Sequence, residues 1–135
     1  MEEELSFRFS DYSPKALAYL GDAYFETLVR EYAVRGGNID IAAANARAKG
    51  CVTAQRQSDA VERLLPLLDA CEEAVYRAGR NTKTAHRSKS ASALDYRRAT
   101  GLECVFGYLY LCGREARARA LFAQVFENRK EDEKE

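Results

Sequence analysis

Residues 13–32, SPKALAYLGDAYFETLVREY, decide how the rest of the chain is arranged. Apolar side chains recur there at i, i+3, i+7 and i+11, which is the spacing of one helix face: Leu17, Leu20, Tyr24 and Leu28. Asp22 is set into this apolar side and directly follows Gly21, whose missing side chain lets another helix or a ligand approach the backbone. The stretch predicts an amphipathic helix that carries a carboxylate at a point of close packing. A surface position or a structural hydrogen bond is the alternative role for Asp22.

A second acid, Glu103, lies far along the chain in another apolar segment. It is the only charge in residues 99–112, ATGLECVFGYLYLC. An ionised carboxylate is costly to bury unless it is paired or holds a cation. Asp22 and Glu103, on two core helices, would be able to meet across a helix pair and bind a hard divalent ion such as Mg²⁺. A salt bridge to Arg30 or Arg97 is the alternative.

Three segments, in this order, resemble the catalytic domain of the ribonuclease III family, and in particular its short branch, Mini-ribonuclease III. They are LAYLGDAYFE at 17–26, AGRNTK at 78–83 and TGLECVFGYLYL at 100–111. The resemblance implies an all-α, homodimeric helical bundle that cuts double-stranded RNA with Mg²⁺. It also implies that Asp22 and Glu103 are the catalytic acids and the metal ligands.

The chain departs from the full-length enzymes of that family at three positions. Lys15, Ala18 and Thr100 stand where those enzymes have acids. The departures are typical of the short branch, and they leave open the number of metal ions and the remaining ligands. Glu26, one helical turn beyond the first acid, is a candidate outer-shell acid. A solvated ion pair with Arg30 at i+4 is its alternative role.

Composition indicates one domain. The chain has 135 residues, of which 47% are hydrophobic. We expect a short tail at 1–12, the catalytic domain at 13–127 and a charged tail at 128–135. We expect no appended RNA-binding module, so the catalytic domain itself would grip RNA. Because the chain shows neither a signal-peptide pattern nor a membrane-length apolar run, we expect a soluble, cytoplasmic protein.

Cysteine and histidine usage favours no other chemistry. The four cysteines have no C-x-x-C spacing and are expected to be reduced core thiols. A single histidine, His86, makes a histidine-based zinc site or a catalytic triad improbable.

Charge is segregated along the chain although the net charge is zero. Residues 77–98 are basic with a single acid, whereas acids concentrate at both ends. We expect residues 80–93 to form a loop that contacts RNA phosphates and 2′-hydroxyls, and so recognises A-form shape. The candidate RNA-binding residues are Arg77, Arg80, Asn81, Lys83, Thr84, Arg87, Lys89 and Arg97. A solvated linker is the alternative.

Local signals predict the helix boundaries. Ser13 with Pro14 opens the first helix, and Gly36 and Gly37 end it. A second helix begins at about residue 38 or 40, and Gly50 is the glycine expected to end it. A third helix runs from Thr53 to Pro66. Asp69 and Glu72 have the spacing of a capping box, which opens a fourth helix that ends at Gly79. A fifth helix covers 94–111, and a last helix follows Gly113, with Leu121, Phe122, Val125 and Phe126 on its apolar face.

The mechanism expected from the acids is phosphodiester hydrolysis that leaves 5′-phosphate and 3′-hydroxyl ends. A two-fold dimer would place two sites across one duplex and make a staggered double cut. Aromatic candidates for the dimer interface are Tyr19, Tyr24, Phe25 and Phe106, most of which we expect in the core of one subunit instead.

The substrate implied by the resemblance is the precursor of large-subunit ribosomal RNA, with a ribosomal protein as a candidate for presenting it. Two alternatives stay open. One is a catalytically weak or inactive duplex-RNA-binding protein of the same fold. The other is a helical interaction domain in which the two acids only satisfy core salt bridges.

Overall fold

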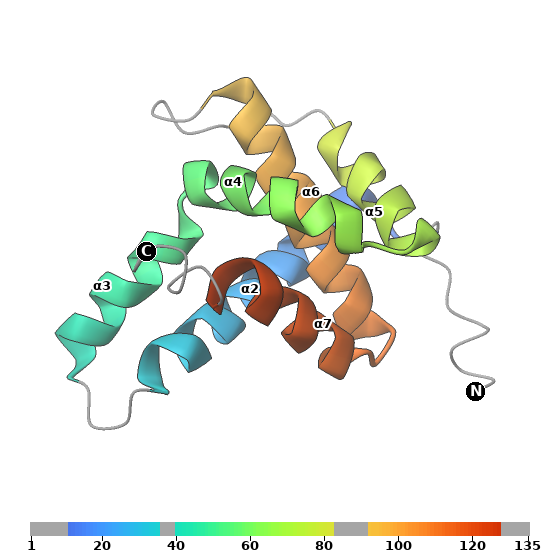
Figure 1. The fold of residues 1–135 in the computed structure, drawn as a ribbon. Helices are drawn as coiled ribbons and strands as arrows, with labels where there is room; N and C mark the ends of the chain where they lie inside the picture. Colours follow the sequence, from blue (N-terminus) through green and yellow to red (C-terminus); the bar gives the residue numbers. More distant parts are fainter. Residues whose placement is uncertain (1–10, 36–39, 83–91, 128–135) are drawn as a thin grey trace.

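The computed structural model describes residues 11–35, 40–82 and 92–127. In chain order they form α2 (Pro14–Val34), α3 (Ile41–Val52), α4 (Ala54–Leu64), the 3₁₀ turn η2 (Leu65–Leu67), α5 (Ala70–Arg80), α6 (Ala93–Leu111), α7 (Glu115–Phe122) and the π-helical turn η3 (Ala123–Glu127). The regular structure of these residues is entirely helical, which confirms the predicted all-α fold (Figure 1). No helix in the described ranges is both long and apolar enough to cross a membrane.

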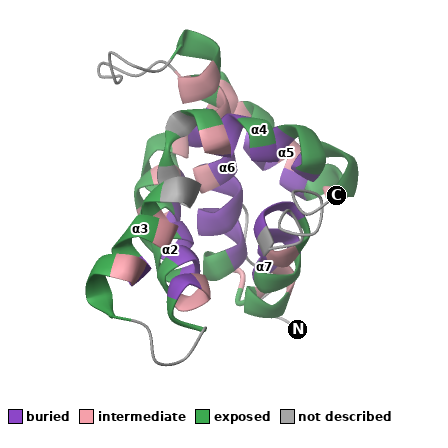
Figure 2. Ribbon diagram, turned by 60° about the vertical axis from the view of Figure 1, so that its left-hand side comes forward, coloured by how far each residue is buried: buried purple, intermediate pink, exposed green. Residues whose placement is uncertain are grey.

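Helix α6 is the central element of the fold. It packs against α2, α4, α5 and α7, and buried residues follow it through the middle of the molecule (Figure 2). Leu102, Val105 and Leu109 are fully buried on one side of the helix, and Cys104 is fully buried on another side. Burial of each such side chain stabilises the fold by roughly 1.5–3 kcal/mol. Residues 99–109 are therefore largely enclosed by other helices, with Glu103 half-buried, whereas Tyr110 and Leu111 at the end of the helix are exposed.

Two glycines bring the backbones of α2 and α6 into direct contact. A Cβ atom added at Gly21 would lie 1.6 Å from the backbone oxygen of Glu103, and one added at Gly107 would lie 2.2 Å from the backbone oxygen of Leu17. Real Cβ atoms do not approach other atoms so closely. The crossing of the two helices therefore depends on glycine on both sides. It also places the residue after Gly21 beside Glu103.

Most predicted helix starts are present. The Ser13 hydroxyl accepts a hydrogen bond from the backbone N–H of Ala16 at 3.0 Å. Asp69 and Glu72 form the predicted capping box. The predicted ends at Gly36 and Gly37 lie outside the described residues.

Two glycines predicted to end helices lie inside them instead. α3 continues through Gly50 to Val52, because extended Thr53 ends it and at the same time caps α4 by accepting from the N–H of Arg56 at 3.2 Å. Gly79 lies within α5, where a Cβ would be 2.6 Å from Cys104 Sγ. The role of Gly79 is thus close packing against α6 and not termination.

Glu72 has a second partner besides its capping box. Its carboxylate is fully buried and accepts hydrogen bonds from Arg117 Nε and Nη2 at 2.9 and 2.8 Å. Arg117 Nη2 also donates to the backbone oxygen of Leu67 at 2.7 Å. A charged contact therefore connects α7 to the N-terminal end of α5, in addition to the apolar core.

The prediction that the cysteines are core thiols is confirmed for Cys104 and wrong for Cys71. Cys104 is buried and Cys112 half-buried, whereas Cys71 is exposed. Cys71 lies in the first turn of α5, and the core side of that turn is occupied by Glu72. The side chain of Cys51 lies outside the described residues.

The glycine contact predicts a large loss of stability for Gly21→Ala. The added methyl group would collide with backbone and not with a movable side chain, so we expect the free energy of unfolding to fall by about 3 kcal/mol or more. Urea unfolding measures the change.

Gly113→Ala is the matched control. Gly113 has φ +72° with no atom within 4 Å of an added Cβ, so only backbone strain of about 1 kcal/mol is expected. Equal losses for the two variants would show that α2 and α6 are not in backbone contact at Gly21.

Candidate active site

Asp22 and Glu103 face each other across the contact of α2 with α6, as the apolar setting of both acids predicted. Their side chains are within hydrogen-bond reach. The pKa of Glu103 is raised to about 8, mainly by burial and also by the negative charge of Asp22 and the hydrogen bond between the two side chains. Asp22 itself is exposed. The pair therefore binds a proton at neutral pH unless a cation takes its place.

Gln57 is the third member of this cluster, and sequence reasoning missed it. It lies on α4, only 4% of its surface is exposed, and its side-chain amide donates a hydrogen bond to Glu103, which lowers the pKa of that acid. A signal was present: Gln57, Ala60, Val61 and Leu64 recur at i, i+3, i+4 and i+7 and share the buried face of α4. A polar residue in such a stripe indicates a buried partner.

Neither acid forms an ion pair with a basic side chain in the part of the chain that the structure describes. Arg30 lies 3.5 Å from Glu26, and both side chains are exposed. The solvated ion pair is thus the observed role of Glu26. Arg97 is exposed on α6 and makes no ion pair with either acid.

Thr100, one of the positions where the full-length enzymes have an acid, does not extend the cluster. Its hydroxyl donates to the backbone oxygen of Tyr96 at 2.9 Å, within α6. The neighbouring thiol of Cys104 contacts the backbone oxygen of Pro14 at 3.1 Å, and burial raises its pKa to about 12. Neither side chain is therefore placed to act as a metal ligand.

The donor set fits Mg²⁺ by its chemistry. Two carboxylates supply hard oxygen ligands, and Mg²⁺ is commonly held by one or two carboxylates with water and substrate phosphate completing its shell. Across residues 11–35, 40–82 and 92–127, no group of three acidic, cysteine or histidine side chains gathers in one place. The described residues thus offer a partial shell built on Asp22 and Glu103.

The predicted RNA-binding residues are only partly described. Arg77, Arg80 and Asn81 lie at the C-terminal end of α5, and Arg97 lies in the second turn of α6. Figure 1 shows these two helix ends at the upper edge of the molecule. The predictions for Lys83, Thr84, Arg87 and Lys89 fall outside the described residues.

Local contacts orient the described basic residues. Arg77 is exposed and forms an ion pair with Glu73, one turn earlier on α5. The Arg80 guanidinium lies over the Tyr76 ring, 5.9 Å from its centroid, and Arg80 Nε donates to Asn81 Oδ1 at 3.2 Å. Arg80 and Asn81 thus form one polar group at the end of α5.

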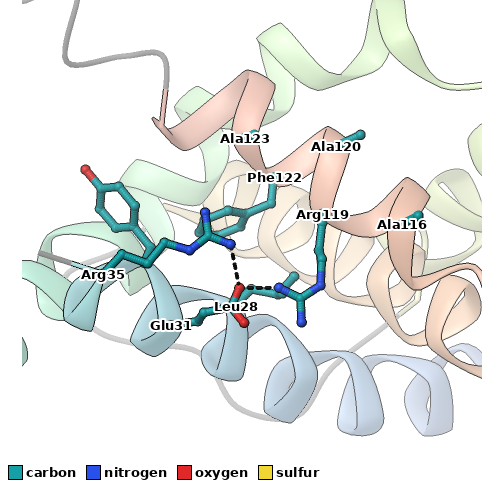
Figure 3. Close-up of a pocket in the computed structure, with 9 residues that line it drawn as sticks. Leu28, Glu31, Arg35, Ala116, Arg119, Ala120, Phe122 and Ala123 are labelled. Carbon is teal, nitrogen blue, oxygen red and sulfur yellow. Dashed lines mark hydrogen bonds and ion pairs between the residues drawn. The ribbon is translucent and has the colours of Figure 1, made fainter. Parts of the chain in front are cut away.

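A separate pocket of about 410 Å³ lies between α2 and α7 (Figure 3). Leu28 and Phe122 contribute its apolar wall, and at its rim the Glu31 carboxylate accepts from Arg35 at 3.1 Å and from Arg119. The hydrogen bond from Arg119 lowers the pKa of Glu31. Glu31 comes nine residues after Asp22, half a rotation around the helix, so the pocket and the two acids lie on opposite sides of α2.

The ribonuclease III domain family matches residues 15–114. The match covers most of the chain and includes both acids and the two glycines of the helix contact. The chain therefore belongs to the ribonuclease III family, a class of endoribonucleases.

Individual relatives narrow the assignment. A Mini-ribonuclease 3 from Brevibacillus brevis is 35% identical over 125 residues, which cover 93% of each chain. A Mini-ribonuclease 3 from Synechococcus is 39% identical over 84% of this chain and 80% of its own. The crystal structure of a Fusobacterium nucleatum protein matches with a TM-score of 0.78 at 30% identity, covering 88% of this chain and 95% of that one. Within the family, the chain belongs to the Mini-ribonuclease III branch.

The raised pKa of Glu103 predicts a pH dependence of stability in the metal-free protein. Folding raises this pKa from 4.5 to about 8, so its contribution to stability is present below pH 4.5 and is lost as pH rises toward 8. Glu103→Gln removes the titration. We expect the variant to gain stability relative to wild type between pH 5 and 8, by roughly 1 kcal/mol per pH unit at most. Urea unfolding in EDTA at several pH values measures the gain.

Glu26→Gln is the control for this experiment, because Glu26 is exposed and its ion pair with Arg30 is solvated. The difference between this variant and wild type should not change over the same pH range. A Glu103→Gln difference that is equally flat would contradict the burial of the Glu103 carboxylate beside Asp22.

Proposed function

We propose that the protein is a Mg²⁺-dependent endoribonuclease that cleaves double-stranded RNA, with Asp22 and Glu103 as catalytic acids and metal ligands. The observation that carries this proposal is the pair of facing carboxylates, contributed by two different helices and without a cationic partner among the described residues. Like charges held together in this way are unfavourable unless a proton or a cation binds between them. Membership of the ribonuclease III family supports the same reading.

The two acids have different tasks at such a site. Exposed Asp22 is accessible to a phosphodiester that approaches from solvent, whereas Glu103 is held in place by its half-buried position on the central helix. Exchange of the proton on this pair for a cation would restore full negative charge at both carboxylates. When bound, Mg²⁺ supplies activation of a water molecule and stabilisation of charge on the leaving 3′-oxygen. Cleavage then leaves 5′-phosphate and 3′-hydroxyl ends.

Duplex binding is assigned to the basic residues beside this site. Arg97 precedes Glu103 by six residues, about 9 Å along the axis of α6. Arg77, Arg80 and Asn81 add cationic and amide donors at the end of α5. Lys83, Thr84, Arg87 and Lys89 complete the proposed set. Contacts of these types to phosphates and 2′-hydroxyls recognise the shape of an A-form duplex.

The narrower assignments extend the same proposal. Residues 13–127 would form the catalytic domain and act in the cytoplasm. The substrate would be the precursor of large-subunit ribosomal RNA, so that the enzyme serves ribosome biogenesis, with a ribosomal protein as the candidate that presents the RNA. These assignments rest on the resemblance to the Mini-ribonuclease III branch.

Cleavage of a labelled RNA duplex tests the assignment of the two acids. We expect cutting in Mg²⁺ and none in EDTA. Asp22→Asn and Glu103→Gln should each lower kcat by at least about 100-fold, because either change removes a charged ligand of the ion. Duplex affinity, measured by a gel shift, should stay within a few-fold of wild type. Glu26→Gln is the control and should cut at nearly the wild-type rate.

The alternatives give different results in that assay. A duplex-binding protein without catalytic function would shift the RNA and leave it uncut in Mg²⁺. An interaction domain would do neither. Loss of folding in Asp22→Asn or Glu103→Gln would assign that acid a structural role.

We also propose that the protein acts as a homodimer in which Tyr19 contacts the partner subunit. Tyr24, Phe25 and Phe106 are buried within one chain, but Tyr19 is 86% exposed. It lies on α2, one helical turn before Asp22. A large exposed aromatic side chain is typical of an interface. An interface at this point would bring two catalytic sites close to the two-fold axis.

Tyr19→Asp should shift the protein toward monomer by at least about 10-fold in the dimer dissociation constant, since it places a charge in an apolar contact. Sedimentation velocity across a concentration series measures this. Ile41→Asp is the control, because Ile41 is 73% exposed at the start of α3. An unchanged dimer in Tyr19→Asp would exclude this interface.

A further inference from the structure

The face of α4 that packs against α6 holds two adjacent buried polar residues, Gln57 and Ser58. They have different partners. The Ser58 hydroxyl accepts a hydrogen bond from Arg98 Nη1 at 3.4 Å, and Arg98 also forms an ion pair with Glu62 at 3.1 Å. Gln57 instead donates to Glu103. Only one of the two side chains is therefore connected to the candidate active site.

Burying the side-chain amide of Gln57 at this position lowers stability unless the amide forms a hydrogen bond. Its neighbours on the same face are Ala60, Val61 and Leu64, all buried. An apolar side chain would fit there without loss of hydration, whereas a buried amide costs roughly 1–3 kcal/mol when it lacks a partner. The packing of α4 on α6 therefore gives no reason for an amide at this position, whereas the Glu103 carboxylate gains a hydrogen-bond donor from it.

The chemistry of the donor matters as well. An amide donates hydrogen bonds without adding a positive charge. A lysine or arginine at this position would bind the carboxylate as an ion pair and compete with a metal ion for it. Gln57 orients the carboxylate and leaves the negative charge of the pair available to a cation.

A hydrogen bond from Gln57 would oppose rotation of the Glu103 side chain away from Asp22. When both acids are ionised, repulsion between Asp22 and Glu103 favours rotation of the Glu103 side chain away from its partner. The backbone of Glu103 is fixed by the contact at Gly21, so only the side-chain torsions are free to respond. A buried hydrogen-bond donor on a third helix restricts those torsions.

We propose that Gln57 is a positioning residue of the active site, whose buried amide holds the Glu103 carboxylate facing Asp22. The inference rests on the proposed function, because it assigns Gln57 a role toward the metal site formed by the two acids. It gives α4 a part in the reaction although α4 contributes no acid to that site.

Gln57→Leu and Gln57→Met test the inference, because both remove the donor and keep most of the buried volume. Two quantities are measured: kcat and KM for a duplex RNA in Mg²⁺, and Mn²⁺ affinity without RNA, from the electron paramagnetic resonance signal of free Mn²⁺. We expect kcat to fall about 10–100-fold and the Mn²⁺ dissociation constant to rise about 10-fold. KM and the thermal unfolding midpoint should stay close to wild type.

Ser58→Ala is the matched control, since it removes the adjacent buried polar group, which hydrogen-bonds to Arg98 instead of Glu103. It should retain kcat and Mn²⁺ affinity. Wild-type kcat and Mn²⁺ affinity in both Gln57 variants would overturn the inference. Losses of kcat that follow equal losses of thermal stability in both variants would also overturn it, because they assign Gln57 to packing alone.

The result for the wild-type protein distinguishes failure of the proposed nuclease function from failure of the role proposed for Gln57. A wild-type protein that neither cuts duplex RNA nor binds Mn²⁺ would contradict the proposed function, and the role of Gln57 would fall with it. A wild-type protein that does both, beside unimpaired Gln57 variants, would retain the function and remove only the role of Gln57.

Discussion

The direct backbone contact between α2 and α6 is the constraint on which the rest of the structure depends. Helices with ordinary side chains at their interface lie about 8–10 Å apart, and Gly21 and Gly107 remove the side chains that would impose this separation. The central helix is thereby fixed against α2, and α4, α5 and α7 cover its remaining sides. Because Asp22 follows Gly21 and Glu103 supplies the contacted backbone oxygen, one contact determines both the packing of the core and the meeting of the two acids.

This arrangement places two neighbouring carboxylates at the point where the backbones of α2 and α6 touch. Burial and the charge of Asp22 both disfavour ionisation of Glu103. The side chains that offset this cost are the apolar residues of the same helix, among them Leu102 and Val105, which are fully buried. The central helix thus supplies both the apolar burial that stabilises the fold and the carboxylate that destabilises it.

Features that depend on nearby residues were readable from the sequence. Ser13 and the pair Asp69–Glu72 act within one turn of their partners, so their spacing alone identifies them. Glycine was harder to interpret, because a helix stop and a close helix contact require the same missing side chain. The predicted helix end at Gly79 is wrong for this reason. Only the position of Cys104 on another helix shows that Gly79 allows close packing.

The candidate site was readable to a similar extent. Asp22 and Glu103 stand out as charges in apolar segments. The apolar stripe of α4 marks Gln57 as a buried polar residue, but nothing local indicates which residue it contacts. Gln57 precedes Glu103 by 46 positions, and its partner follows only from the packing of α4 on α6. The exposure of Cys71 likewise follows from which side of α5 meets the core.

The contact of Glu72 with Arg117 has a consequence for how the molecule opens. The Glu72 carboxylate caps the start of α5 by accepting from the backbone N–H of Asp69, and it is also the buried anion for the guanidinium of Arg117 on α7. Detachment of α7 would separate the guanidinium from that carboxylate, and removing one partner of a buried ion pair costs of order 3–5 kcal/mol. The capping box and the last helix therefore belong to one cooperative unit. We expect transient opening of α7 to extend to the N-terminal turn of α5, some 45 residues earlier in sequence.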